Sequence, residues 1–351
     1  MPSCLQEKFD METLVVTGAA GFIGGYIVRE ALASGYKVIG IDNLSKYGEV
    51  DSKFIKDKNF NLIIGDARDA KLLEEIFDKA DHVIAGAAMI GGISYFHTYP
   101  YDLLATNERI IASTCDAAIR AFSNGRLRKL TYLSSSMVFE STTSWPSSEG
   151  DQLEIAPPLS SYGFQKLSVE YFAKAAWDQY HLPYTILRPF NCVGIGERRA
   201  VGGIAINSGG VLLAMSHVVP DLVQKILKGQ DPVYLLGSGD QLRCYTYGQD
   251  LAKGVIASLN HSNAYNQDFN LSTSEVTSVL ALAELIWKKV HGTSKPFRYE
   301  CEAGFTFDVQ KRIPDVDKAK KLLGFEATTS LDEMLDEVIP WVKEAISSGL
   351  I

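Results

Sequence analysis

Residues 14–28 read LVVTGAAGFIGGYIV: an apolar run, glycines at a spacing of three (Gly18, Gly21 and Gly24), and a second apolar run. This pattern predicts a buried strand, a tight turn and a helix. Glycines in such a turn let backbone N–H groups and the helix N-terminus approach a pyrophosphate, although glycine also serves any sharp corner. Asp42 favours the first interpretation, because it ends the next predicted strand, where its carboxylate can bind the ribose of an adenosine. The sequence therefore predicts a dinucleotide-binding turn.

The first half of the chain alternates short apolar runs with amphipathic segments of helical length. Buried strands are predicted at 13–18, 37–42, 60–66, 82–88, 129–135 and 184–190. Because helices separate them, they indicate an α/β fold with a doubly wound parallel sheet. The longest of these helices are predicted at 101–122 and 161–180. After Arg188 a glycine-rich stretch begins a second, looser region, and an amphipathic helix ends the chain.

Composition excludes several classes of function. The chain has 351 residues and a net charge of -8, with Lys and Arg scattered along it, which argues against a nucleic-acid partner. Its five cysteines are widely separated, so we expect no zinc site, no redox dithiol and no metal, but reduced thiols in a cytoplasmic protein. The first residues, MPSCLQEKFDMET, contain acids and no apolar core, and no later apolar stretch reaches the roughly 20 residues that span a bilayer. We therefore expect neither a signal peptide nor a membrane partner.

Two carboxylates indicate which dinucleotide binds. Asp42 would repel a 2′-phosphate, which favours NAD over NADP. Asp66 ends the third predicted strand, where it can reach the adenine amino group. An N-cap for the following helix is an equally good interpretation of Asp66, and the two are compatible.

The catalytic candidates come from two further segments. In SSYGFQKLSVE, Tyr162 and Lys166 lie four residues apart, which places both side chains on one face of a helix. An ammonium beside a phenol favours the phenolate, so the pair predicts a base near neutral pH. Upstream, YLSSSMVFE places Ser134, Ser135 and Ser136 at the end of the fifth predicted strand, on the edge of the sheet where ligands bind. Each feature alone is weak, but their order along the chain is specific.

Taken together, these motifs resemble the extended short-chain dehydrogenase/reductases, in particular the NAD-dependent nucleotide-sugar epimerases and dehydratases. TGAAGFIG is similar to their cofactor turn, DNL and GDARD to their second and third strand ends, and Tyr162 and Lys166 to their Tyr-x-x-x-Lys. RPFNCVG is similar to their Arg-Pro-x-Asn-x-x-Gly segment, and later segments continue the resemblance nearly to the end of the chain.

The resemblance implies an enzyme with tightly bound NAD+ and a nucleotide-diphosphate sugar as substrate. Ser135, Tyr162 and Lys166 would be catalytic. The implied cofactor site comprises Gly18, Gly21, Phe22, Ile23, Gly24, Asp42, Asn43, Asp66, Ala67, Ala87, Tyr162, Lys166 and Pro189. The implied substrate site comprises Gly91, Gly92, Ser135, Ser136, Asn191, Arg243 and Arg312, in which guanidinium groups suit phosphate oxygens.

Departures from the family pattern indicate the reaction. The dehydratases carry an acidic pair directly after the catalytic Ser or Thr, and the sugar decarboxylases carry a glutamate two residues after it. Here those positions are Ser136 and Met137, and methionine cannot donate or accept a proton. Oxidation and reduction at C4 need no such group, so the sequence favours C4 epimerisation through a transient 4-keto sugar.

Alternatives stay open. The loop MIGGISYFHTYP (89–100) resembles that of the GDP-mannose 3,5-epimerases, whose chemistry needs a further acid and base; His97, His217, Glu140 or Arg199 could supply a proton carrier. A 4-keto-sugar reductase ranks level with that epimerase. A catalytically silent NAD-binding regulatory module is the minor alternative, because such proteins typically lose the Tyr or the Lys that this chain keeps.

The resemblance also implies an architecture. The Rossmann domain would comprise residues 1–190 and 240–272, and a smaller α+β domain for the nucleotide sugar would comprise 191–239 and 273–351. Members of the family commonly form homodimers through the two long helices. The apolar positions that could supply that surface, or instead a monomer core, are Leu103, Leu104, Ile110, Ile111, Val169, Phe172 and Trp177.

Overall fold

The larger part of the chain is a parallel seven-stranded sheet. The computed structural model describes residues 11–48, 53–90, 98–201, 206–213, 217–304 and 309–351. The strands follow the order β13-β6-β5-β4-β1-β2-β3, and every neighbouring pair is parallel. Their bounds are β1 (Thr13–Thr17), β2 (Lys37–Asp42), β3 (Phe60–Ile64), β4 (His82–Ala85), β5 (Lys129–Leu133), β6 (Tyr184–Pro189) and β13 (Gln267–Leu271). The predicted doubly wound Rossmann sheet is confirmed.

The strand β13 is an addition to the predicted six. Its sequence, QDFNL, contains three polar residues and lacks the uniform apolar pattern of the other strands. It closes the β6 edge of the sheet, and its polar side chains are held by partners: Asp268 pairs with Arg188, and Asn270 donates to the Ser147 carbonyl oxygen. Polar contacts with distant segments of the chain thus replace the apolar pattern as the reason for this strand.

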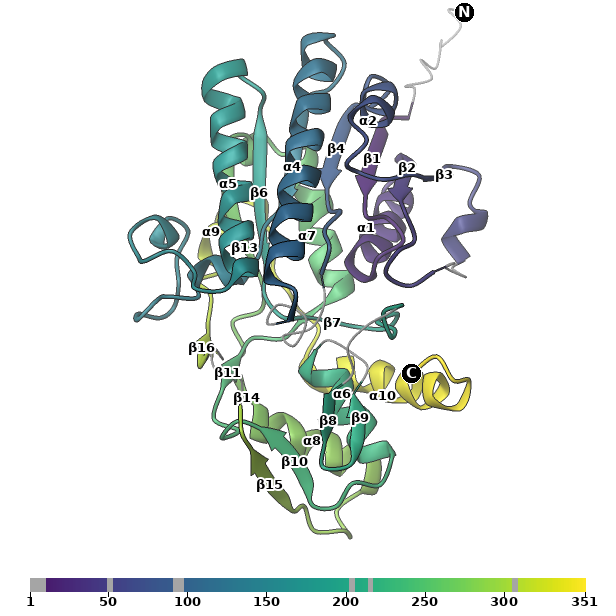
Figure 1. Cartoon of the computed structure of the whole chain (residues 1–351), viewed down its shortest axis with the longest axis vertical. Coiled ribbons are helices and arrows are strands. Elements are labelled where there is room, and N and C mark those ends of the chain that lie inside the picture. The colour runs from purple at the N-terminus through teal and green to yellow at the C-terminus, as the bar shows by residue number, and fades with distance from the viewer. Residues whose placement is uncertain (1–10, 49–52, 91–97, 202–205, 214–216, 305–308) are drawn as a thin grey trace, which may run out of the picture.

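Helices cover both faces of the sheet (Figure 1). One face carries α2 (Ala70–Phe77), α4 (Pro100–Ser123) and α5 (Ser161–Tyr180), which share a core with the strands. The other carries α1 (Phe22–Ala33), α7 (Gly248–Asn260) and α9 (Asp317–Leu323). Because β1 leads to β2 on one side and β4 lies on the other, the strand order reverses at β1, which opens a crevice at the carboxyl ends of these strands.

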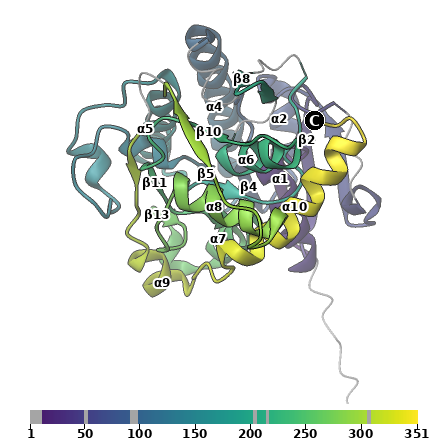
Figure 2. The same cartoon turned by 90° about the horizontal axis from the view of Figure 1, so that it is seen from below.

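The remaining elements form a smaller α+β part below that edge. The helices α6 (Val218–Leu227), α8 (Val279–His291) and α10 (Leu331–Ser347) pack on one another around a second core (Figure 2). Its strands are short: β7 (Cys192–Val193), β8 (Ile206–Ser208), β9 (Val211–Leu213), β10 (Val233–Leu236), β11 (Leu242–Arg243), β12 (Thr246–Tyr247), β14 (Thr277–Ser278), β15 (Tyr299–Glu302) and β16 (Lys311–Arg312). The 3₁₀ helices are η1 (Lys53–Lys56), η2 (Ser136–Phe139), η3 (Asp151–Leu153) and η4 (Ser262–Ala264).

The two long helices α4 and α5 pack against each other, and the structure separates their core residues from their surface. Leu103, Ile111 and Val169 lie in the core, so these three cannot form a dimer surface. Exposed aromatic side chains on the same helices are Tyr101, Phe164, Tyr171 and Tyr180, of which Tyr171 is 60% exposed. Within the described ranges, no helix combines the length and the apolar character needed to cross a membrane.

Candidate active site

One large cleft lies between the carboxyl edge of the sheet and the smaller part, with a volume of about 610 Å³. This size is typical of sites for small molecules and cofactors. Its walls contain every predicted site residue that the structure describes, from the glycine turn of β1 to Arg312 of β16. Gly91 and Gly92 lie outside the described residues. The cleft therefore brings the predicted cofactor, catalytic and substrate residues into one space.

The glycine turn between β1 and α1 has no room for side chains. Gly18 has a φ of +76°, and a Cβ there would lie 2.9 Å from the Gly86 carbonyl oxygen. A Cβ on Gly24 would lie 2.0 Å from the carbonyl oxygen of Gly18. Gly21 is the N-cap of α1 and has no side chain to occupy the free amides of the first turn. The turn thus leaves a helix N-terminus open toward the cleft, which fits a pyrophosphate group.

Asp42 lies at the end of β2 with its carboxylate fixed by backbone amides. Its Oδ2 accepts from the Ala20 amide at 3.0 Å, and its Oδ1 accepts from the Leu44 amide at 2.8 Å. The carboxylate therefore stands beside the glycine turn, as binding of an adenosine ribose requires. These features fit NAD, which Gly18, Gly21, Gly24 and Asp42 would hold.

Asp66 lies in the cleft wall after β3, where it binds other side chains. Arg68 donates to it through Nε at 3.0 Å and through Nη2 at 2.6 Å. These hydrogen bonds lower the pKa of Asp66 to about 2. Its N-cap interpretation was wrong: α2 is capped by Asp69, whose Oδ1 accepts from the Lys71 and Leu72 amides.

The three catalytic candidates come from the end of β5 and the first turns of α5. Ser135 Oγ accepts from the Met137 amide at 3.2 Å and is hydrogen-bonded to Tyr162. Lys166 Nζ donates to the Leu133 carbonyl oxygen at 2.9 Å and lies 6.0 Å from the centroid of the Tyr162 ring. The helix starts where Ser160 accepts from the Gly163 amide, which places Tyr162 in its first turn.

The protonation states differ from the prediction made from spacing alone. Burial raises the pKa of Tyr162, although the hydrogen bond with Ser135 and the charge of Arg312 lower it in part. Burial also lowers the pKa of Lys166 to about 8. Burial thus disfavours the charged form of both groups, which opposes the effect of the Lys166 ammonium on the Tyr162 phenol. A positive charge beside the phenol, such as an oxidised nicotinamide ring, would favour the phenolate.

The lowered pKa of Lys166 makes a testable prediction for the cofactor-free protein. Below pH 8 the charged ammonium is buried at a cost of up to about 3 kcal/mol, and the cost falls as pH rises through the folded pKa toward 10.5. Lys166→Met removes this cost, so we expect it to raise the melting temperature at pH 7 and to converge with the wild type near pH 10. Thermal melts at the two pH values check this. An equal stabilisation at both would show that the ammonium charge is not its cause.

On the other side of the cleft, two arginines lie next to each other. Arg243 of β11 is paired in register with Arg312 of β16. The Arg243 Nη1 group donates to the Leu242 and Gln310 carbonyl oxygens at 2.9 and 3.2 Å, which fixes its guanidinium. Asn191 has a positive φ of 36° and donates to the Cys244 carbonyl oxygen at 3.1 Å. Two adjacent guanidinium groups fit a dianionic diphosphate.

The structure describes three of the four suggested proton carriers. Only His217 lines the cleft; its Nδ1 lies 2.5 Å from Glu197 Oε1, and Glu197 is buried. Glu140 instead accepts from Ser160 Oγ at 2.7 Å at the start of α5, and Arg199 is exposed, away from the cleft wall. His97 lies outside the described residues.

The sequence analysis missed the contribution of α6. Val218, Val219, Asp221, Leu222 and Lys225 line the cleft. Burial and the nearby Glu197 raise the pKa of Asp221 well above its ordinary value. An acid in the middle of the apolar run VVPDLV was the available indication, but it does not show which way the helix faces.

Comparison with known proteins assigns the family. The profile of the NAD dependent epimerase/dehydratase family matches residues 14–272, most of the chain. This chain belongs to that family. The predicted resemblance and the predicted cofactor class are thereby confirmed.

The individual relatives share about a quarter of their residues with this chain. The chain is 28% identical to a UDP-N-acetyl-alpha-D-glucosaminuronate decarboxylase of Bacillus cytotoxicus, covering 94% of this chain and 97% of the relative. It is also 28% identical to a putative UDP-glucose 4-epimerase of Methanocaldococcus jannaschii, covering 94% and 98%. Among solved structures, the UDP-glucose 4-epimerase of Thermotoga maritima with UDP-glucose is 27% identical, with a TM-score of 0.78 over 95% of this chain and 99% of that one. That of Bifidobacterium longum, solved with NAD+ and UDP, is 25% identical, with a TM-score of 0.75 over 95% and 98%.

Proposed function

We propose that this protein is an NAD-dependent 4-epimerase of a nucleotide-diphosphate sugar, with UDP-hexoses or UDP-hexuronic acids as the first candidates. One observation carries the proposal: Ser135, Tyr162 and Lys166 share a cleft with the glycine turn and two arginines, while Met137 stands where an acid would be needed for elimination. The relatives named above act on UDP-linked sugars, which supports the uridine nucleotide.

In the proposed mechanism the chain binds and orients the sugar and moves one proton. Arg243 and Arg312 hold the diphosphate, and Ser135 donates a hydrogen bond to the C4 oxygen. Tyr162 takes the proton of the C4 hydroxyl during oxidation and returns it during reduction. When bound, NAD+ supplies hydride acceptance from C4 and hydride return to either face of the resulting ketone. The 4-keto sugar would turn over between the two steps within the cleft, whose volume is about 610 Å³.

Decarboxylation is the reaction of the B. cytotoxicus relative and must be distinguished. The resemblance to the family implies that its decarboxylases carry a glutamate two residues after the catalytic Ser or Thr. Met137 occupies that position, is buried, and lines the cleft. A thioether cannot transfer a proton, which disfavours loss of carbon dioxide in this chain.

A second candidate is epimerisation at C3 or C5, which the pairing of His217 with Glu197 supports. His217 lines the cleft and is oriented by the buried carboxylate of Glu197, an arrangement that suits proton transfer. A 4-keto sugar has acidic protons at both neighbouring carbons. Deuterium at C3 or C5 after incubation in D2O would indicate this candidate, whereas a 4-keto-sugar reductase would show turnover only with a 4-keto sugar and NADH or NADPH.

The test is incubation of the purified protein with UDP-glucose and UDP-glucuronic acid, without added cofactor, followed by proton NMR of the sugar. We expect the C4 epimer, with no loss of carbon dioxide. A pentose product would instead indicate decarboxylation. No change with these or with GDP-, CDP- and dTDP-linked sugars would direct the test to 4-keto sugars with NADH or NADPH. If these are also unchanged and NAD is tightly bound, the binding-module alternative is left.

We also propose the division into a Rossmann domain (1–190 and 240–272) and a nucleotide-sugar domain (191–239 and 273–351). The composition of the sheet and the packing of α6, α8 and α10 support it, whereas α9, which lies within 273–351, packs on the sheet with α1 and α7 and so joins the Rossmann core. A cytoplasmic location is consistent with the thiols of Cys115, Cys192, Cys244 and Cys301, which are free of disulfides.

A homodimer through α4 and α5 is the proposed assembly, because exposed aromatic side chains lie on both helices. The substitution Tyr171→Glu places a charge at the centre of this surface, where Tyr171 is 60% exposed. We expect it to convert a dimer into a monomer in light scattering, with the melting temperature of the monomer fold retained. A matched change at an exposed tyrosine elsewhere, Tyr299→Glu, should leave the dimer intact. A wild-type protein that is already monomeric at all concentrations would contradict the assembly.

A further inference from the structure

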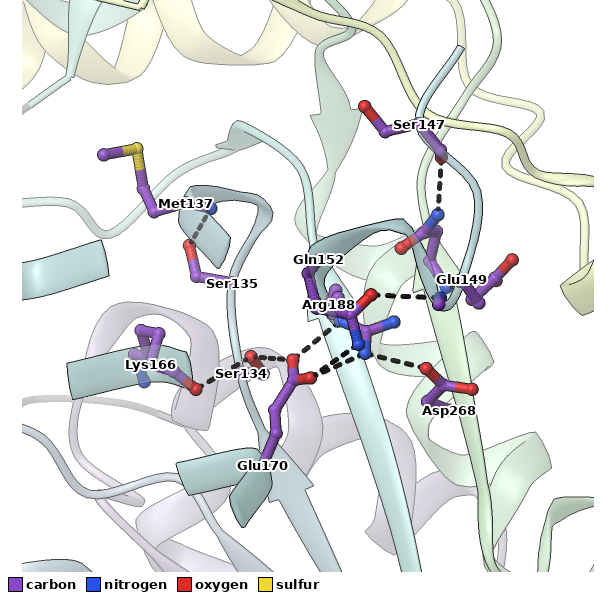
Figure 3. A network of polar contacts seen from close by, with 12 residues as sticks. Ser134, Ser135, Met137, Ser147, Glu149, Gln152, Lys166, Glu170, Arg188 and Asp268 are labelled. Atoms are coloured by element: carbon purple, nitrogen blue, oxygen red, sulfur yellow. Dashed lines mark hydrogen bonds and ion pairs between the residues drawn. The ribbon is translucent and has the colours of Figure 1, made fainter. Parts of the chain in front are cut away.

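A buried network of charged side chains lies directly behind the catalytic candidates (Figure 3). Its centre is the carboxylate of Glu170, which is 1% exposed. We propose that Glu170 is a positioning residue that fixes α5, with Tyr162 and Lys166, against the ends of β5 and β6. This inference deepens the proposed function and rests on it.

Glu170 is hydrogen-bonded to residues at the ends of two strands, β5 and β6. Ser134 Oγ, next to Ser135, donates to Glu170 Oε1 at 2.7 Å and lies 3.3 Å from the Lys166 carbonyl oxygen. Arg188 of β6 donates to both oxygens of Glu170 at 2.7 Å. One carboxylate thus joins the end of β5, the third turn of α5 and the end of β6. A shift of any of these elements would break a buried charged hydrogen bond, which is why they hold one position.

Arg188 extends the same network to the turn that follows Ser135. Its guanidinium lies 5.5 Å from the centroid of the Phe139 ring, at the end of η2. The arginine is 0% exposed and is charge-balanced by Glu170 and by Asp268 of β13, whose other oxygen accepts from Lys318 at 2.8 Å. Two carboxylates and two cations therefore neutralise each other. Loss of Glu170, the carboxylate that also binds Ser134, would leave the Arg188 charge unbalanced directly behind Ser135.

A third branch connects Glu170 to the loop beside the substrate arginine. Gln152 Nε2 donates to Glu170 Oε2 at 3.0 Å. Five residues earlier in the same loop, the Ser147 amide donates to the Ile313 carbonyl oxygen at 2.8 Å, next to Arg312. The loop thus spans from the catalytic helix to the strand that would hold the diphosphate. Glu170 is thus connected to the catalytic residues directly and to the strand of Arg312 through the loop that carries Gln152.

The decisive variant is Glu170→Gln, which keeps the shape and removes the charge. We expect kcat for the epimerisation to fall about 10- to 100-fold with KM changed little, because misplacement of reacting groups by about 1 Å has effects of this size. The hydrogen bond with Ser135 lowers the pKa of Tyr162. A looser hydrogen bond in Glu170→Gln should therefore raise the pKa of Tyr162 and move the acidic limb of the kcat profile to higher pH.

The matched control is Asp268→Asn, which neutralises the other carboxylate partner of Arg188 but touches neither Ser134 nor Lys166. We expect it to lower the melting temperature and to leave kcat and its pH profile unchanged. If both variants lower the melting temperature alike and neither moves kcat or the pH profile, Glu170 is only structural and the proposal is wrong.

A readout without turnover separates this inference from the proposed function. In cofactor-free protein, hydrogen exchange of the amides of residues 134–139 should accelerate in Glu170→Gln but not in Asp268→Asn, because Ser134 N–H is bonded to the Leu187 carbonyl oxygen at 2.8 Å at this junction. If Glu170→Gln fails to fold, Ser134→Ala, which removes one bond to the carboxylate, should show the same changes to a smaller degree. Unchanged hydrogen exchange in folded Glu170→Gln, or in Ser134→Ala where Glu170→Gln does not fold, would overturn the inference. A wild type inactive on all nucleotide sugars would overturn the function alone.

Discussion

Tyr162→Phe should lower kcat about 1,000-fold, within the range that removal of a general base produces. The Tyr162 hydroxyl, in the first turn of α5, is hydrogen-bonded to Ser135 in the cleft. Phenylalanine fills the same space, so NAD content and the affinity for nucleotide sugar should be retained. Single-turnover absorbance at 340 nm, which follows the reduced cofactor, measures the chemical step directly.

Tyr132→Phe is the matched control for that substitution. Tyr132 is also buried, lies on the same strand that leads to Ser135, and shares a 3.4 Å contact between its hydroxyl and Cys115 Sγ. It does not line the cleft. Its variant should lose some stability and keep kcat within about twofold of the wild type. Near-normal activity of Tyr162→Phe would assign the base to another group.

Gly24→Ala should abolish the cofactor site. The added Cβ would lie 2.0 Å from the Gly18 carbonyl oxygen, a backbone atom of the same turn that cannot move without displacing the pyrophosphate-binding amides. We expect a loss of stability of about 3 kcal/mol, the upper end of ordinary overpacking. We also expect NAD to bind at least tenfold more weakly, a loss of about 1.4 kcal/mol. Calorimetric titration with NAD and thermal melts measure the two effects.

The neighbouring residue supplies the control. A Cβ on Gly25 would meet the Phe54 ring at 3.6 Å, an ordinary contact, although it lies in the same helix. Gly25→Ala should therefore gain about 0.5 to 1 kcal/mol from the better helix former and bind NAD normally. If Gly24→Ala bound NAD as well as Gly25→Ala does, the proposed role of the turn would be wrong.

Much of the fold could be predicted because its physical causes are local. The apolar runs of β1 and β2 indicate buried strands. The glycines between β1 and α1 indicate a tight turn that leads into a helix. The same holds for Tyr162 and Lys166, whose spacing places them on one face of α5.

Other features depend on contacts between distant segments, and these contacts leave no local pattern in a single sequence. The strand β13 is polar and is held by Arg188, and the capping of α2 falls on Asp69 and not on Asp66. The pKa of Lys166 depends on how deeply the fold buries it. The contribution of α6 to the cleft depends on how the smaller part packs below the sheet.

The central claim, C4 epimerisation with internal return of the hydride, is tested most directly by an isotope experiment. The purified protein is incubated in D2O with UDP-glucose and UDP-glucuronic acid, with no added cofactor, and the products are read by proton NMR. The account predicts a C4 epimer without deuterium at any carbon. Deuterium at C3 or C5 would contradict it and would point to proton exchange beside the ketone, where His217 is the described candidate.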